Sequence, residues 1–79
     1  MTHRNDLITS DAQSVTPSDS TTFLYAGLYV GTGGDVKVTT AGGTNVTFTS
    51  VLGSTIIPLG ITKVWSTGTT ASDIVGFFN

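Results

Sequence analysis

Hydrophobic and polar residues alternate most cleanly in two neighbouring segments, residues 35–40 and 45–49. In the first, Val36 and Val38 share one phase, and charged and threonine residues occupy the other. A period of two is typical of a β-strand with one buried face. Residues 41–44, which contain two glycines, predict a turn between these strands.

Three further segments, residues 23–30, 55–65 and 73–78, are rich in the β-branched and aromatic residues that strands favour. The middle segment does not keep one alternation of apolar positions from end to end. We expect a bulge or bend near Pro58 or Gly60, because proline cannot donate to a strand ladder and glycine often marks a bulge.

Residues 31–34 read Gly-Thr-Gly-Gly and predict a turn, so that the segments 23–30 and 35–40 would form a hairpin. Five to six short strands result, separated by glycine-rich turns, and no segment has helical periodicity. This spacing predicts an all-β fold, a small antiparallel β-sandwich or barrel.

The start of the chain has a different character. Residues 1–20 are polar and aperiodic, and only Leu7, Ile8 and Val15 could be buried. Such a segment buries too little apolar surface to offset its ordering entropy alone. We predict an extended N-terminal arm over residues 1–20 that is ordered where it docks, followed by a β domain over residues 21–79. A plain disordered terminus is the alternative.

Composition removes most classes of function. Only 10% of the 79 residues are charged, with no cysteine, no glutamate and one histidine. We therefore expect no enzyme, and no catalytic, cofactor-binding or metal site. The net charge of −2 supplies no basic surface for nucleic acid. No stretch approaches the roughly 20 apolar residues of a membrane helix. A structural or binding protein remains.

The aromatic residues allow two uses. A body of roughly 55–60 residues without disulfides or metal is marginally stable, which favours self-association. We predict Trp65, Phe77 and Phe78 at a subunit interface, because the same chain can hardly shield two terminal phenylalanines. The alternative is a small carbohydrate-binding β module that stacks sugars on Tyr25, Tyr29 and Trp65.

Several sequence runs resemble the spike base protein family of tailed phages and gene transfer agents. The resemblance covers about residues 11–77. The runs that carry it are Val15 to Thr21 (VTPSDST), Leu28 to Val36 (LYVGTGGDV), Thr44 to Phe48 (TNVTF), Ile56 to Leu59 (IIPL) and Trp65 to Gly76 (WSTGTTASDIVG).

The resemblance implies a virion protein, made in the cytoplasm of a bacterial host and bound to the capsid exterior. It implies a cyclic homo-oligomer, a pentamer or trimer, that contacts the major capsid protein and carries a spike fibre protein. Leu7, Ile8 and Val15 would then dock on the capsid or on a neighbouring subunit. A cement protein at another capsid symmetry axis is the alternative within this class.

Overall fold

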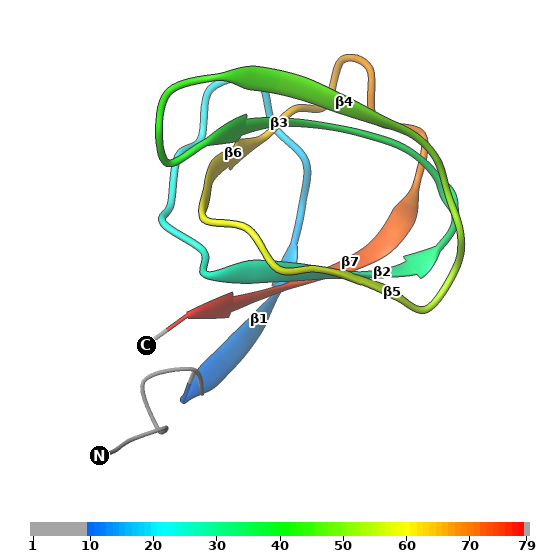
Figure 1. The fold of residues 1–79 in the computed structure, drawn as a ribbon, viewed down its shortest axis with the longest axis horizontal. Helices are drawn as coiled ribbons and strands as arrows, with labels where there is room; N and C mark the ends of the chain where they lie inside the picture. The colour runs from blue at the N-terminus through cyan, green and yellow to red at the C-terminus, as the bar shows by residue number, and fades with distance from the viewer. Residues whose placement is uncertain (1–9, 79) are drawn as a thin grey trace.

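The computed structural model describes residues 10–78 as two antiparallel β-sheets that face each other (Figure 1). The strand order is β1-β7-β2-β5 in one sheet and β4-β3-β6 in the other. The predicted all-β class is confirmed, and of the two predicted architectures, a small antiparallel sandwich or barrel, the structure has the sandwich. No helix long and apolar enough to cross a membrane occurs within residues 10–78. The seven strands are β1 Asp11–Val15, β2 Gly27–Thr32, β3 Gly34–Thr40, β4 Asn45–Val51, β5 Thr55–Ile57, β6 Ile61–Val64 and β7 Ser72–Phe78.

The core lies between the sheets and is built from the inward phase of each strand. Leu28 and Val30 of β2 are fully buried, as are Val36 and Val38 of β3 and Ile61 of β6. The predicted inward phase of residues 36 and 38 is thus confirmed. Alternation fixes this outcome, because a slip of one residue would turn the whole apolar set of a strand to solvent.

The turn predicted at residues 41–44 joins β3 to β4 as a hairpin. The N–H of Thr40 donates to the carbonyl oxygen of Thr44 at 2.8 Å, and the N–H of Gly43 donates to that of Thr40 at 2.9 Å. Gly43 has φ 91°, a left-handed conformation that glycine adopts without steric cost.

The hairpin predicted between residues 23–30 and 35–40 is wrong. Strand β2 pairs with β5 and β7, whereas β3 pairs with β4 and β6, so the chain changes sheet at Gly33 and Gly34. A Cβ on Gly33 would lie 2.5 Å from the carbonyl oxygen of Val51, and one on Gly34 would lie 2.7 Å from the amide nitrogen of Ala71. These glycines therefore serve close backbone approach at a corner between sheets.

The apolar segment 55–65 is interrupted as predicted. Strand β5 ends at Ile57 and β6 begins at Ile61, and Pro58 to Gly60 carry the chain from one sheet to the other. The conflict of phase is resolved inside β6, where the register of its pairing with β3 shifts between Thr39 and Thr40. Ile61 and Val64 are therefore both buried, although they are three positions apart.

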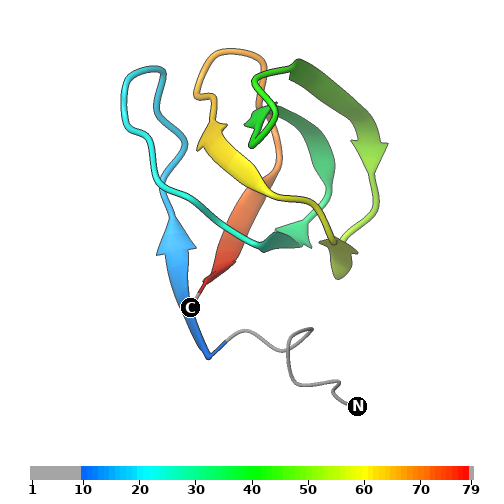
Figure 2. The same cartoon turned by 60° about the vertical axis from the view of Figure 1, so that its left-hand side comes forward.

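Strand β1 was not predicted, and with it the strands number seven within residues 10–78 rather than five or six. It lies inside the proposed arm and pairs along the edge of the four-stranded sheet, with Asp11 opposite Phe78 and Val15 opposite Ile74 (Figure 2). Its sequence, Asp-Ala-Gln-Ser-Val, has weak strand propensity, so pairing with β7 decides its conformation. The domain boundary at residue 20 stays a prediction.

Candidate functional site

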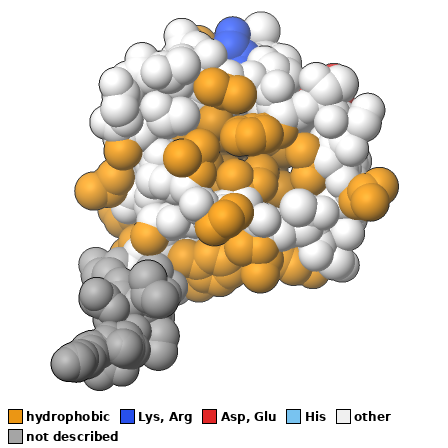
Figure 3. Space-filling view, viewed as in Figure 1, with side chains coloured by type: hydrophobic (Ala, Val, Ile, Leu, Met, Phe, Trp, Pro, Cys, Tyr) orange, Lys and Arg blue, Asp and Glu red, His pale blue; other side chains and the backbone are white. Residues whose placement is uncertain are grey.

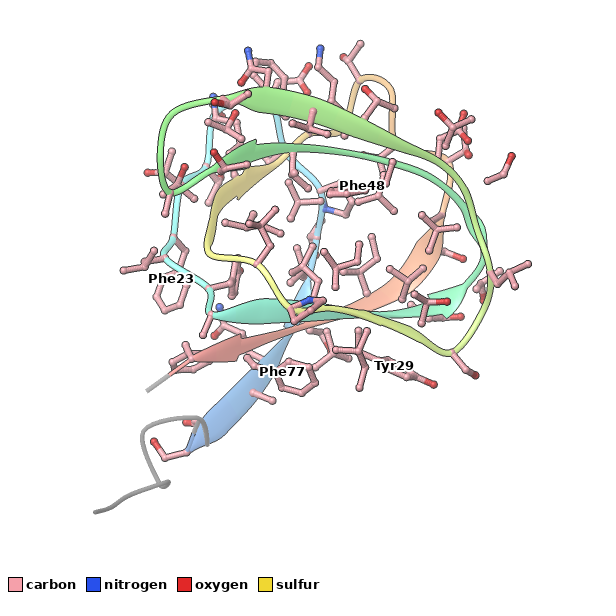
Figure 4. All side chains as sticks on the ribbon, viewed as in Figure 1. Phe23, Tyr29, Phe48 and Phe77 are labelled. Carbon is pink, nitrogen blue, oxygen red and sulfur yellow. The ribbon has the colours of Figure 1, made fainter. Side chains whose placement is uncertain are left out.

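The outer face of the four-stranded sheet is mainly apolar, and Ser14 of β1, in register with Val75, is a polar residue on it. Its residues lie opposite one another across the strands: Tyr29 is in register with Val75 and with Ile56, and Ala12 is in register with Phe77. Figure 4 shows Tyr29 and Phe77 outside this sheet, on the side away from the other sheet, whereas Phe48 lies between the sheets. The name apolar outer face is used below for Ala12, Tyr29, Ile56, Val75 and Phe77.

Exposure makes this face a candidate for contact with another molecule. Ile56 is 58% exposed, and Tyr29, Val75 and Phe77 are half-buried. A strand that is apolar in both phases is typical of a sheet that is covered on both sides. Contiguous exposed apolar side chains on a soluble domain commonly mark an interaction surface.

The outer face of the three-stranded sheet is polar and carries an aromatic residue in contact with two cations. The ammonium groups of Lys37 and Lys63 lie 4.6 Å and 4.3 Å from the centroid of the Trp65 ring. The indole N–H of Trp65 donates to Thr39 Oγ1 at 2.9 Å. We call these four residues the Trp65 cluster. Figure 3 shows the cationic side chains at the upper rim, on the side of this sheet.

Asp19 fastens the loop that follows Trp65. Its Oδ1 accepts the N–H groups of Ser66 and Thr67, each at 2.9 Å, and its Oδ2 accepts the Thr67 hydroxyl at 2.6 Å. The hydrogen bond from the Thr67 side chain contributes most to holding the pKa of Asp19 below its ordinary value, and the backbone bonds and Lys37 act in the same direction. The Asp19 carboxylate is therefore ionised at neutral pH, and both of its oxygens accept hydrogen bonds from the loop.

The structure brings only some of the predicted docking and interface residues to the surface. Leu7 and Ile8 lie outside the described residues. Val15 is half-buried and packs against the core of its own chain. Phe78 packs there too, with its ring 5.1 Å from that of Phe23. Only Phe77 lies on the apolar outer face, and the docking and interface roles of all these residues stay predictions.

The three aromatic residues of the carbohydrate-binding alternative do not share a surface. Tyr25 is buried in the core, with 7% of its surface exposed. Tyr29 lies on the outer face of one sheet, and Trp65 lies on that of the other. Stacking a sugar on all three is therefore geometrically impossible in this fold.

The sequence did not indicate a hollow at one end of the sandwich, because its lining comes from separate segments. Leu24 is 64% exposed there and Phe23 is 41% exposed. No charged residue lines the hollow. Its lining residues are Phe23, Leu24, Tyr25, Ala26, Gly60 and Phe78.

Metal-ligating side chains do not gather within residues 10–78. No set of three or more His, Cys, Asp or Glu side chains in this range could hold a metal ion. Asp35 serves the fold, because its Oδ1 accepts the backbone N–H of Ser50 at 2.9 Å. What the surface offers instead is two contrasting outer faces, as expected of a small structural protein that contacts other molecules.

Comparison with known proteins shows the family to which this chain belongs. No family model matches the chain, and no curated protein does. Among solved structures, a chain from "Capsid of native GTA particle computed with C5 symmetry" matches with 36% sequence identity and a TM-score of 0.78. The match covers 89% of this chain and 83% of the other. The protein belongs to the family of this gene transfer agent capsid chain, and the role of that family member is structural rather than enzymatic.

Proposed function

We propose that the protein is a head spike base or capsid decoration protein, bound to the outside of an icosahedral capsid. The similarity to the gene transfer agent capsid chain carries this proposal, since it extends over 89% of the protein at 36% identity. The resemblance to the spike base family favours a position at a capsid vertex, and a cement protein at another symmetry axis is the alternative.

The proposed assembly is a cyclic homo-oligomer, a pentamer or a trimer. The apolar outer face supplies a contact surface. Tyr29 pairs with Val75, Phe77 lies two positions further along β7, and Ile56 is more than half exposed. Apolar aromatic surface is typical of the buried centre of a subunit interface. In a closed ring every subunit would bury this face against its neighbour.

The proposed partners are the major capsid protein on one side of the ring and a spike fibre protein on the other. Leu7 and Ile8, together with Val15, are the residues proposed to dock on the capsid or on a neighbour. Val15 ends β1 and pairs with Ile74, so a truncation that removes it also removes an edge strand.

Reconstitution on particles tests this function. Particles from cells that lack the gene are mixed with purified protein, and bound protein is measured after sedimentation of the particles. We expect saturable binding by the full chain. Deletion of residues 1–9 retains β1 and should abolish binding with little change in the unfolding midpoint. Deletion of residues 1–15 should also lower that midpoint. If the full chain does not co-sediment with particles, the proposal is wrong.

A further inference from the structure

We propose that the Trp65 cluster binds an acidic segment of a partner polypeptide, whose carboxylates pair with Lys37 and Lys63. This site lies on the three-stranded sheet, and the face assigned to ring formation lies on the other sheet. The inference goes beyond the capsid role and does not depend on it.

The first observation is the concentration of positive charge. Within residues 10–78, Lys37 and Lys63 are the only lysine or arginine side chains, and both ammonium groups lie within 4.6 Å of the same ring centroid. Neither lysine forms an ion pair with a carboxylate of the described chain. Two nearby like charges repel each other, and an external carboxylate would relieve that repulsion.

The nearby carboxylate of Asp19 attracts Lys37 but forms no ion pair with either lysine. Its two oxygens are engaged by the N–H groups of Ser66 and Thr67 and by the Thr67 hydroxyl. Lys63 does reach Asp19, but it donates to the backbone carbonyl oxygen, at 3.0 Å. The ammonium groups therefore retain capacity for a further anion.

The second observation is that the lysines are held in place. Lys37 passes beside Gly68, where an added Cβ would lie 3.1 Å from Lys37 Cδ. Lys63 is fixed through Asp19, and the Trp65 ring through its bond to Thr39. Ordering a free lysine side chain opposes binding, so restraint in the unbound protein favours association.

The position of the ammonium groups favours a carboxylate over a stacked sugar. Both lie over the indole ring, where cation–π attraction holds them. A saccharide would need that ring surface open for stacking. A carboxylate needs only the outward-facing N–H donors of the two lysines, and an acidic peptide presents such groups at intervals along an extended chain.

Trp65 is the only tryptophan in the chain, so its fluorescence reports on this site alone. The probe is a short oligo-glutamate peptide, with oligo-glutamine of equal length as its neutral control and polygalacturonate as an anionic polysaccharide. We expect a saturable emission change with oligo-glutamate only. It should weaken strongly between about 0.01 M and 1 M salt, where the screening length falls from about 30 Å to about 3 Å.

Substitutions locate the binding groups. Lys37→Gln and Lys63→Gln should each weaken oligo-glutamate binding by about two- to fivefold, and Lys→Arg at either position should restore it. Unfolding midpoints show that each variant is folded. Four results would overturn the proposal: no saturable change, an equal response to oligo-glutamine, tighter binding of polygalacturonate, or full binding by the double Lys→Gln variant.

Discussion

The two sheets share one core but present opposite surfaces. Outside the four-stranded sheet, β7 places Val75 and Phe77 beside Tyr29. Outside the three-stranded sheet, β3 places Lys37 and Thr39 beside Thr47 and Asn45. The inward residues of both sheets are apolar, so the difference lies wholly in the outward phase of the strands.

This contrast indicates where further burial is needed. Thr39 donates to Asn45 at 2.6 Å and accepts the Trp65 indole N–H, so the polar face is satisfied by hydrogen bonds among its own side chains. On the apolar outer face only the Tyr29 hydroxyl makes such a bond, to Ser54 Oγ at 3.3 Å, and water is a poor environment for the remaining side chains. We infer that the four-stranded sheet contacts subunits through apolar burial and that the three-stranded sheet recognises charge.

The largest effect is expected in the core that both sheets share. Leu28→Ala should lower the free energy of unfolding by about 2–5 kcal/mol, because Leu28 is fully buried and truncation leaves a cavity. Leu52→Ala is the matched control, since Leu52 is 77% exposed, and its effect should stay within about 0.5 kcal/mol. Denaturant unfolding measures both. Equal losses would show that Leu52 is also buried, in an assembly.

The next largest effect separates the two outer faces. Phe77→Asp should weaken self-association by about 2–4 kcal/mol, because it places a carboxylate at the centre of the proposed apolar contact. Thr49→Asp adds the same charge at an exposed position on β4 and should leave association unchanged. Sedimentation velocity compares them. If association survives Phe77→Asp, the subunit contact of the ring does not lie on the four-stranded sheet.

A smaller effect is expected in the Trp65 cluster. Trp65→Ala should cost about 2–3 kcal/mol of stability, less than a fully buried tryptophan, because the side chain is half-buried. Thr39→Val removes the acceptor of the indole N–H and should cost about 1–2 kcal/mol. Both variants should still form the ring. Loss of the ring in Trp65→Ala with full stability would instead place Trp65 at the subunit interface.

The smallest effect concerns acid. Because the folded pKa of Asp19 lies below its ordinary value, its hydrogen bonds stabilise the fold above the unfolded pKa of about 4. That contribution is lost as the pH falls through the lower, folded pKa. Asp19→Asn should therefore lower the unfolding midpoint at neutral pH, and the difference from the wild type should vanish in stronger acid. A difference that is independent of pH would rule out ionisation as its cause.

Strand assignment was predictable wherever alternation is strong. Val36 and Val38 gave the inward phase of β3, and Pro58 and Gly60 marked the change of sheet. Strand β1 was not predictable, because its residues favour no particular structure and β7, which holds it, lies about sixty residues away in the chain. The hairpin prediction failed at Gly33 because a turn and a corner between sheets use the same glycine-rich sequence.

The surfaces were less predictable than the strands. The exposed aromatic residues were recognisable, but the sequence could not assign Phe77 and Trp65 to different sheets. The Trp65 cluster depends on the pairing of β3 with β6, which brings Lys37 beside a tryptophan 28 positions later. No local pattern specifies that pairing, since it follows from the arrangement of the whole core.

Electron cryo-microscopy of purified particles tests the central claim most directly. The reconstruction is made from particles of the wild type and of a strain that lacks the gene. The account predicts density for this β-sandwich on the outside of the fivefold vertices of the wild type, with the apolar outer face buried between copies, and no such density in the deletion strain. Identical vertices in the two reconstructions would contradict it.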